Sequence, residues 1–168
     1  MTNEPTSATT ARFPDEYGER TPDDLMPWSY VDEKLRSALN YWLATAGPSG
    51  RPHSRPVDGV WVEGALCFGG SPETRWVRNL QTNPGVSVNL SSEAEAIILE
   101  GAAELITDPG HPLAVASTAA NKVKYPQYFA AGLFDEFHPF WALRARTAYA
   151  WSLDGFPSRA TKWTFDTV

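Results

Sequence analysis

Cysteine, histidine and long apolar runs are all scarce in this 168-residue chain. The single cysteine, Cys67, cannot form an internal disulfide, which is typical of a reducing cytoplasm. The longest apolar runs, such as residues 96–99, are far shorter than the roughly 20 residues that span a membrane. The first residues have neither the basic flank nor the apolar stretch of a signal peptide, and no Cys/His pair has zinc-ligand spacing. We therefore expect a cytoplasmic protein without membrane contact and without a metal site.

The chain also lacks an excess of positive charge. It has 14 Lys and Arg against 20 Asp and Glu, a formal net charge of −6. Residues 1–33 hold eight of the acids and two of the bases, so residues 34–168 are balanced at twelve of each. A protein that binds nucleic acid through its phosphates needs a basic surface, so no nucleic-acid partner is expected. We interpret residues 1–27 as an acidic N-terminal arm without a core of its own, and residues 28–168 as one domain.

Most of the domain has the periodicity of strands. Expected strands cover residues 41–45, 51–61, 65–68, 86–90, 94–107, 137–153 and 160–165. Pro52 and Pro56 place the second of these at a sheet edge or at a bulge, because proline cannot donate to a strand ladder. Gly101 indicates a bulge in the fifth. This pattern favours a mainly β protein, a small antiparallel barrel with a few helices.

Helices are expected at three places. Ser29 is the predicted N-cap of a helix over residues 30–39. Ser71 and Pro72 are the predicted cap and first residue of a second helix, which ends at the Asn83-Pro84-Gly85 stop signal. An Ala-rich helical region runs from about residue 111 to Gly132, between the fifth and sixth strands.

The segment from Ser71 to Pro84 carries the most chemical information. On a helix, Arg75, Arg78 and Asn79 fall on one face. The free N–H groups of the first turn, with Thr74 and Arg75 beside them, suit a phosphate group. The same pattern also describes an ordinary amphipathic helix with a solvated basic face, and the spacing alone leaves both interpretations open.

Several short motifs follow one another along the chain. They are Leu43-Ala44-Thr45, Gly50-Arg51-Pro52-His53, residues 74–80, residues 83–88, Glu100-Gly101-Ala102-Ala103 and residues 160–165. Their order and spacing resemble the pyridoxamine 5′-phosphate oxidase-like split-barrel superfamily over roughly residues 30–166. The ending Ala160-Thr161-Lys162-Trp163-Thr164-Phe165 is similar to that of its flavin/deazaflavin oxidoreductase branch.

The resemblance implies a six-stranded antiparallel split β-barrel that forms a homodimer, with FMN or coenzyme F420 in two grooves at the dimer interface. In this family the second strand lies along the isoalloxazine ring, and the segment after the third strand binds the phosphate-bearing tail. Carried onto this sequence, the cofactor-binding residues are His53, Ser54, Arg55 and Val57 beside the ring, Phe68, Gly69 and Gly70 toward the tail, Thr74 and Arg75 at the phosphate with Trp76 and Arg78 next to them, and Lys162 and Trp163 of the partner subunit.

Two departures from the family pattern bear on function. Many members have a lysine where this chain has Trp76, and that lysine contacts the phosphate. Its loss removes one charge-assisted hydrogen bond of about 1.5–3 kcal/mol, for which Arg75 or Arg78 would compensate. The C-terminus also lacks the Arg-x-His segment of true pyridoxamine phosphate oxidases, so oxidation of vitamin B6 is not expected.

The resemblance therefore implies an oxidoreductase in which the cofactor transfers a hydride to an unsaturated, CH–CH type bond of a small planar substrate. The C-terminal ending favours coenzyme F420 over FMN. No catalytic residue is identified, because solvent can supply the proton; His53, Ser54 or Tyr149 would assist. Two alternatives remain open: an FMN-binding oxidoreductase of the pyridoxamine phosphate oxidase type, and a non-catalytic module that binds flavin, haem or another planar ligand.

The other candidate residues are assigned structural roles. His111 and His138 each precede a proline and are interpreted as loop or strand-start residues. Cys67 lies on an apolar strand and is interpreted as inert packing. The acidic residues of the fifth strand region are interpreted as a solvated strand face, namely Glu93, Glu95, Glu100 and Glu104.

Overall fold

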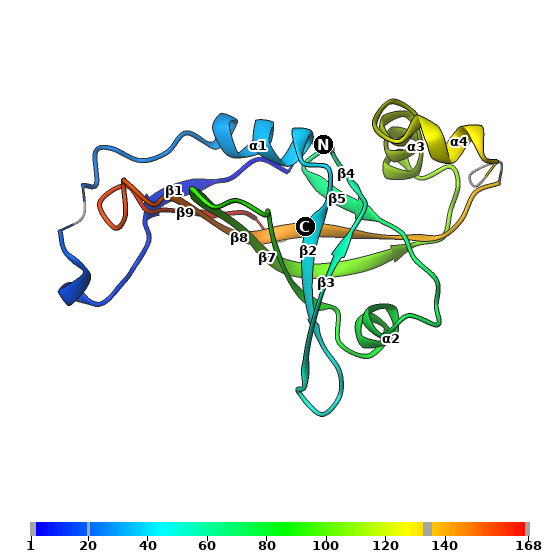
Figure 1. Cartoon of the computed structure of the whole chain (residues 1–168), viewed down its shortest axis with the longest axis horizontal. Helices are drawn as coiled ribbons and strands as arrows, with labels where there is room; N and C mark the ends of the chain where they lie inside the picture. Colours follow the sequence, from blue (N-terminus) through cyan, green and yellow to red (C-terminus); the bar gives the residue numbers. More distant parts are fainter. Residues whose placement is uncertain (1–2, 20, 133–135, 167–168) are drawn as a thin grey trace.

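The computed structural model describes residues 3–19, 21–132 and 136–166. Figure 1 shows an elongated molecule in which long strands run through the middle and helices lie at the periphery. In chain order the elements are β1 (Ser7–Thr10), a 3₁₀ helix (Asp15–Tyr17), α1 (Trp28–Ser37), β2 (Tyr41–Ala46), β3 (Pro52–Val57), β4 (Val60–Val62), β5 (Ala65–Phe68), α2 (Arg75–Thr82), β6 (Gly85–Asn89), β7 (Glu95–Ile106), α3 (Pro112–Lys124), α4 (Pro126–Ala130), β8 (Phe140–Ser152) and β9 (Thr161–Thr164).

The central strands form a split barrel. β2 pairs with β3 and β6, β6 with β7, β7 with β8, β8 with β5, and β5 with β4, all antiparallel. Only Asp58 and Gly59 separate β3 from β4, and there the chain leaves the β2 ladder and joins that of β5. Counted as one interrupted strand, β3 and β4 complete the predicted six-stranded barrel. β9 and β1 extend the sheet beyond it from β8. The predicted mainly β, antiparallel split-barrel fold is confirmed.

Two irregularities of the sheet follow from single residue types. β3, which contains Pro52 and Pro56, stands at the end of the strand order and pairs with β2, as expected for a strand that lacks two N–H donors. The register of β7 against β8 shifts between Glu100 and Gly101. A Cβ at residue 101 would lie 2.3 Å from the carbonyl oxygen of Arg144, so only glycine permits this approach. The irregularity predicted at Gly101 is confirmed, but the extra residue of the bulge is Arg146 of β8.

Apolar residues pack on both sides of the barrel wall. Along β5, Leu66 and Phe68 belong to the large cluster inside the barrel, whereas Ala65 and Cys67 face a second cluster with Leu113 of α3. This alternation is the period of two that a strand imposes on its side chains. Strand β5 is therefore covered on one face by the barrel core and on the other by α3, which lies above β4 and β5 in Figure 1.

Both predicted helix caps are wrong. α1 begins at Trp28 with Pro27 at the N-cap position, because the Trp28 ring packs edge-to-face on Trp163 and fixes the start of the helix. α2 begins only at Arg75. The Ser71 hydroxyl accepts a hydrogen bond from the Glu73 N–H at 3.2 Å and so forms a local turn instead of a helix cap. Among the described residues, no helix combines the length and apolar character needed to cross a membrane.

The N-terminal arm packs along the domain. β1 pairs with β9, from Ser7 opposite Thr164 to Thr10 opposite Thr161. The Ala11 N–H donates to the Ala160 carbonyl at 2.7 Å, and Ala11 is buried. The arm thus contributes an edge strand to the sheet. The division into an arm of residues 1–27 and a domain of residues 28–168 stays a prediction.

A half-buried lysine holds the split between β3 and β4. Lys124 Nζ donates to the Gly59 carbonyl at 2.6 Å and to the Tyr41 hydroxyl at 3.1 Å. The Gly59 N–H donates to the Tyr125 hydroxyl at 3.1 Å, and that hydroxyl lies 2.7 Å from the Leu39 carbonyl, to which it donates. Burial lowers the pKa of Lys124 to about 8, against the opposing effect of Asp58.

This lysine makes stability depend on pH. The unfolded chain holds the Lys124 proton up to the ordinary pKa of 10.5, whereas the folded protein releases it near 8. The unfolded state therefore binds more protons between these values, and the contribution of Lys124 to the free energy of unfolding rises with pH. We expect wild type to gain about 1 kcal/mol over Lys124→Met between pH 7 and 10, after allowance for solvent at a half-exposed amine. Urea unfolding at each pH measures this difference, with Lys122→Met as the control. A difference that stays constant with pH would contradict the assignment.

Candidate functional site

Three basic side chains from two elements lie together beside β3. His53 and Arg55 are on β3 and Arg75 begins α2. Burial lowers the pKa of His53, and the positive charges of Arg75 and Arg55 lower it further. These three residues, here called the basic group, were all predicted as cofactor-binding. Ser54, the fourth predicted residue of this strand segment, is exposed between His53 and Arg55.

The first turn of α2 lies next to the basic group. Thr74 stands at the N-cap position without a side-chain capping bond, because its hydroxyl donates to the Ser71 carbonyl at 2.8 Å. The N–H groups of the first turn are thus left without a side-chain cap, and the positive end of the helix dipole adds to the charge of Arg75. Arg78 is exposed one turn further along. This is the geometry expected of a phosphate site.

One predicted member of the basic helix face is instead a buried anchor. Asn79 is 6% exposed, and its Nδ2 donates to Thr45 Oγ1 of β2 at 3.0 Å. A buried amide needs a partner, and the Thr45 hydroxyl supplies it. The prediction that Asn79 shares a solvated face with Arg75 and Arg78 is therefore wrong, and the residue fastens α2 to the barrel.

Trp76 is a core residue and not a phosphate ligand. Its side chain is 6% exposed, and its ring centroid lies 5.6 Å from that of Phe68. A Cβ at residue 70 would lie 2.3 Å from Trp76 Cζ2, so Gly70 makes room for the indole. Where a lysine would reach outward, this chain buries an aromatic ring against Phe68 and Gly70. Within α2 the cationic side chains are those of Arg75 and Arg78.

Two further predicted residues are buried within the protomer. Val57 and Trp163 belong to the barrel core, and Trp163 is only 2% exposed. Its indole packs on Trp28 at 5.5 Å between ring centroids, so the Trp163 side chain has no free face to offer a second subunit. Lys162, by contrast, is half-buried on β9 opposite Thr9, far from α2 in Figure 1. Its contact with the groove of a partner stays a prediction.

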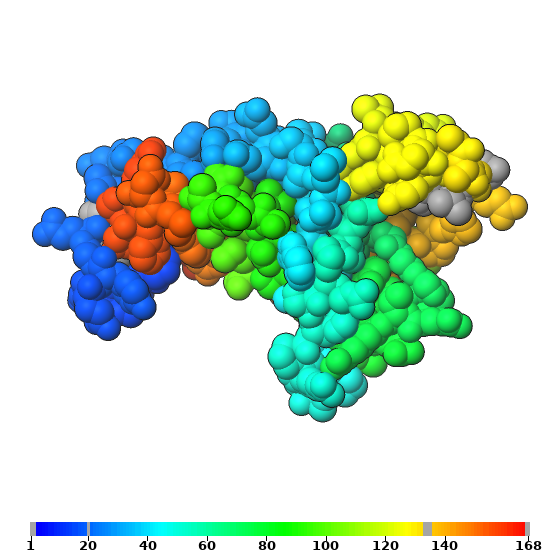
Figure 2. Space-filling view, viewed as in Figure 1, coloured from blue at the N-terminus to red at the C-terminus, as the bar shows by residue number. Residues whose placement is uncertain are grey.

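A large cleft opens beside the predicted cofactor residues. It has a volume of about 1440 Å³ and lies between α3 and α4 on one side and the segment after β5 on the other. Figure 2 shows this hollow between the yellow and green segments on the right of the molecule. Three of the residues predicted to bind the cofactor line it, namely Phe68, Gly69 and Gly70. We call it the α3 cleft.

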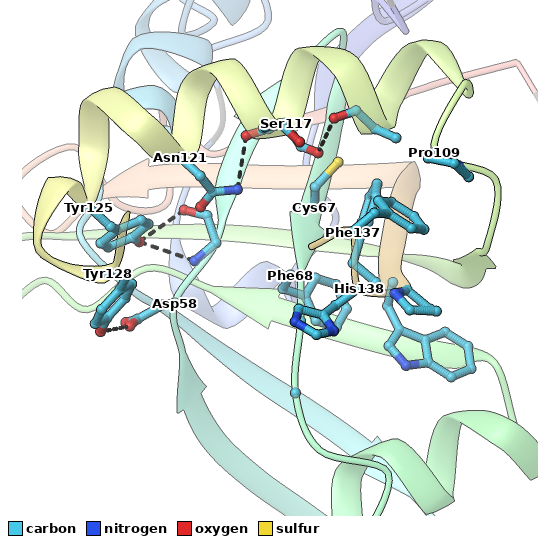
Figure 3. A pocket seen from close by; sticks show the side chains of 18 of the residues that line it. Asp58, Cys67, Phe68, Pro109, Ser117, Asn121, Tyr125, Tyr128, Phe137 and His138 are labelled. Carbon is cyan, nitrogen blue, oxygen red and sulfur yellow. Dashed lines mark hydrogen bonds between the residues drawn. The ribbon is translucent and has the colours of Figure 1, made fainter. Parts of the chain in front are cut away.

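The α3 cleft has an aromatic end and a polar end. Figure 3 shows Phe68, Phe137 and His138 close together at one end, and Asp58 with Tyr128 at the other. The Tyr128 hydroxyl donates to Asp58 Oδ2 at 2.5 Å. Sequence reasoning missed the cleft wall. It interpreted His138 as a loop or strand-start residue, and His138 does lie in the loop just before β8, but its place in the cleft was not foreseen. The aromatic-rich run from Phe137 to Trp141 is the feature of the sequence from which this surface was predictable.

The remaining candidates have structural roles. His111 is the N-cap of α3, with its Nδ1 accepting from the Leu113 N–H at 3.1 Å. Cys67 is buried and packs in the cluster with Leu113, as expected for a packing residue, and burial raises the pKa of its thiol to about 12. Glu95 is not simply solvated, because it accepts a hydrogen bond from Tyr30 and pairs with Lys34 at 2.9 Å. Within the described ranges, no three His, Cys, Asp or Glu side chains gather as metal ligands.

The comparisons with known proteins agree on one class, the split-barrel proteins. The family model described as pyridoxamine 5′-phosphate oxidase matches residues 30–152, and this chain belongs to that family. A search of the curated proteins finds no match.

Solved structures show the same fold. A haem-binding protein from Mycobacterium smegmatis is 22% identical with a TM-score of 0.64, over 83% of this chain and 59% of that one. The haem storage protein HutZ from Vibrio cholerae is 21% identical with a TM-score of 0.56, over 70% and 87%. An FAD-binding protein from Mesorhizobium loti is 15% identical with a TM-score of 0.57, over 83% and 96%. The fold is therefore shared by proteins that bind flavin and proteins that bind haem.

Proposed function

We propose that this protein is a flavin- or deazaflavin-dependent oxidoreductase, and that coenzyme F420 is its cofactor. The observation that carries the proposal is the basic group of His53, Arg55 and Arg75 at the uncapped start of α2. An anionic group is the natural ligand of such a place, since helix N–H donors and a guanidinium converge on it. Membership of the pyridoxamine 5′-phosphate oxidase family supports a flavin-type ring attached to that phosphate.

The residues present suit such a cofactor. Arg75 and the first-turn N–H groups of α2 would hold its phosphate, and β3, with His53 half-exposed, would lie along its ring. The cofactor, when bound, supplies hydride transfer. Phe68 and the two following glycines line the α3 cleft, and the Phe68 ring packs on Trp76 in the first turn of α2. The chain thus orients the ring and shields the adjoining space from water with aromatic side chains.

The charges around His53 determine whether its imidazole is protonated. The lowered pKa of His53 keeps its imidazole neutral at pH 7, with one N–H to donate and one nitrogen to accept. A nearby phosphate would oppose the effect of Arg75 and Arg55 and raise that pKa again. His53 can therefore hold a proton beside the ring while the cofactor is bound. We propose this as an assisting role, with solvent as the proton source.

Coenzyme F420 and the dimer rest on the C-terminal segment. The ending from Ala160 to Phe165 is similar to that of the deazaflavin-using branch. Lys162 of this ending is half-buried on β9, so part of its side chain is exposed to solvent. We propose that Lys162 of the partner subunit completes each groove, so that a cytoplasmic homodimer has two sites. The substrate is a small planar molecule with an unsaturated, CH–CH type bond.

Expression in a host that makes flavins but no deazaflavin tests this proposal. We expect the protein to be purified without bound flavin, to bind added coenzyme F420, and to oxidise reduced F420 when an enone is supplied. Absorbance of the purified protein and of the F420 chromophore measures both steps. If the purified protein carries FMN, the cofactor assignment changes from F420 to FMN. If the protein binds neither cofactor, the proposal is overturned.

A second candidate function is haem binding, and His138 is the observation that favours it. This histidine lines the α3 cleft with Phe68, Phe137 and Trp141, and imidazole is a common axial ligand of haem iron. Titration with haemin measures it, because ligation by histidine produces a sharp Soret band. A Soret band that His138→Ala abolishes would favour this candidate over the flavin-type oxidoreductase.

A further inference from the structure

The α3 cleft leads to an inference about the substrate, and this inference rests on the oxidoreductase proposed above. We infer that the cleft binds the substrate, and that the substrate is an uncharged, planar and largely apolar molecule. The anionic cofactor and the uncharged substrate would thus occupy two neighbouring surfaces of opposite character, which meet at Phe68, Gly69 and Gly70.

Apolar side chains form most of the cleft wall. Phe68, Phe137, Phe140 and Trp141 supply aromatic surface at one end, and aromatic walls favour a flat ligand that can stack or meet them edge-on. Val115 of α3 is 63% exposed within this wall. Covering such an exposed valine with an apolar ligand removes its surface from water and so contributes favourably to the free energy of binding.

The cleft is larger than most small-molecule pockets. Its volume of about 1440 Å³ exceeds the roughly 300–1,000 Å³ of typical ligand pockets. The small residues Ala114, Thr118 and Ala119 keep the α3 side open, and each leaves space that a larger side chain would fill. The floor is rigid, because Cys67 and Phe68 belong to a strand that is packed on both faces.

The charges that line the cleft disfavour an anion. Asp58 and Glu136 are carboxylates, and they face a single lysine, Lys122, together with His138. Asp58 is fixed by the Tyr128 hydroxyl at 2.5 Å, which holds its negative charge at the polar end of the cleft. The basic group, where an anion is expected, lies outside the cleft on β3 and α2. A negatively charged substrate would therefore be repelled here, whereas an uncharged one would not.

Two fluorescent probes with the same ring system separate charge from shape. N-phenyl-1-naphthylamine is uncharged, and 8-anilino-1-naphthalenesulfonate is the same anilinonaphthalene skeleton with one sulfonate. Both become fluorescent in apolar surroundings. We expect the uncharged probe to bind wild type at least tenfold more tightly than the sulfonate. Equal affinities, or tighter binding of the sulfonate, would overturn the inference.

Two valines on one helix give a matched pair of variants. Val115 lines the cleft, whereas Val123 of the same helix is 84% exposed and lies outside it. Val115→Glu is expected to weaken binding of the uncharged probe at least tenfold, and Val123→Glu to leave it unchanged. Circular dichroism of both variants confirms that they are folded. Equal effects of the two variants would show that the probe binds elsewhere and would overturn the inference.

The experiment also separates this inference from the proposed function. Titration of Val115→Glu with FMN and coenzyme F420 is expected to give wild-type affinities, because Val115 is not part of the basic group. Cofactor binding without probe binding would overturn the inference alone. Probe binding without cofactor binding would overturn the proposed function and leave the cleft as a site for apolar ligands. A loss of the dimer in Val115→Glu, together with no probe binding by wild type, would assign the cleft to a second copy of the chain and overturn the inference.

Discussion

Replacing Arg75 with alanine is expected to weaken the binding of FMN and coenzyme F420 by about 10- to 150-fold. A charge-assisted hydrogen bond to phosphate contributes about 1.5–3 kcal/mol, and each 1.4 kcal/mol is a factor of ten in affinity. The fold should be unaffected, because within the described ranges the Arg75 guanidinium makes no hydrogen bond or ion pair with another residue. Fluorescence titration of the purified variant measures the effect.

Two controls make the Arg75 result specific. Arg12→Ala removes an exposed arginine from the arm, at the opposite end of the molecule from α2, and it should leave cofactor binding unchanged. Riboflavin has the ring of FMN without the phosphate, so its affinity should be the same for wild type and Arg75→Ala. A loss of riboflavin affinity equal to the loss for FMN would show that Arg75 acts on the ring or on the fold.

Replacing Trp163 with alanine is expected to destabilise the protein by about 3–5 kcal/mol, the usual cost of truncating a buried tryptophan. The indole is 2% exposed and packs on Trp28 within the barrel core. The free energy of unfolding from urea titration measures this loss. Because the cavity lies inside one protomer, the loss should not depend on protein concentration.

Lys162, the residue before Trp163 on β9, provides the matched control for the loss of stability in Trp163→Ala. Lys162 is half-buried on the same strand, and Lys162→Ala should change stability by no more than about 0.5 kcal/mol. If the partner subunit completes the groove, Lys162→Ala should weaken cofactor binding, and dimers with one variant subunit should retain one wild-type site. A large loss of stability in Lys162→Ala, or none in Trp163→Ala, would contradict the assignment of the two side chains.

The sequence predicted those features that depend on one residue type and its nearest neighbours. Gly101 indicated the register shift between β7 and β8, and the prolines of β3 indicated an edge strand, because each acts through the backbone geometry of its own position. Phe68 to Gly70, which the family resemblance assigned to the passage toward the cofactor tail, line the α3 cleft, and their contact with a cofactor stays a prediction. His53, Arg55 and Arg75 were grouped through the family resemblance, and the structure brings them together although 20 residues separate Arg55 from Arg75.

The features that the sequence left unpredicted depend on contacts between distant segments. The burial of Asn79 is decided by Thr45 on another element, and that of Trp163 by Trp28 across the whole length of the chain. Lys124 holds Gly59 from a helix 65 positions away. Helical and strand periodicity show which residues share one face of an element, but they do not show which residues of other elements pack against that face. The α3 cleft escaped prediction for the same reason, since its walls come from segments spread between residues 58 and 141.

The most direct test of the proposed site is calorimetric titration of the purified protein with two ligand pairs. One pair is FMN and riboflavin, and the other is coenzyme F420 and its phosphate-free deazaflavin fragment. A phosphate site formed by Arg75 and the start of α2 predicts that the phosphate-bearing member of each pair binds at least tenfold more tightly. The C-terminal segment from Ala160 to Phe165 separately predicts that F420 binds more tightly than FMN. Equal affinities within both pairs, or no binding of any of the four ligands, would contradict the phosphate site.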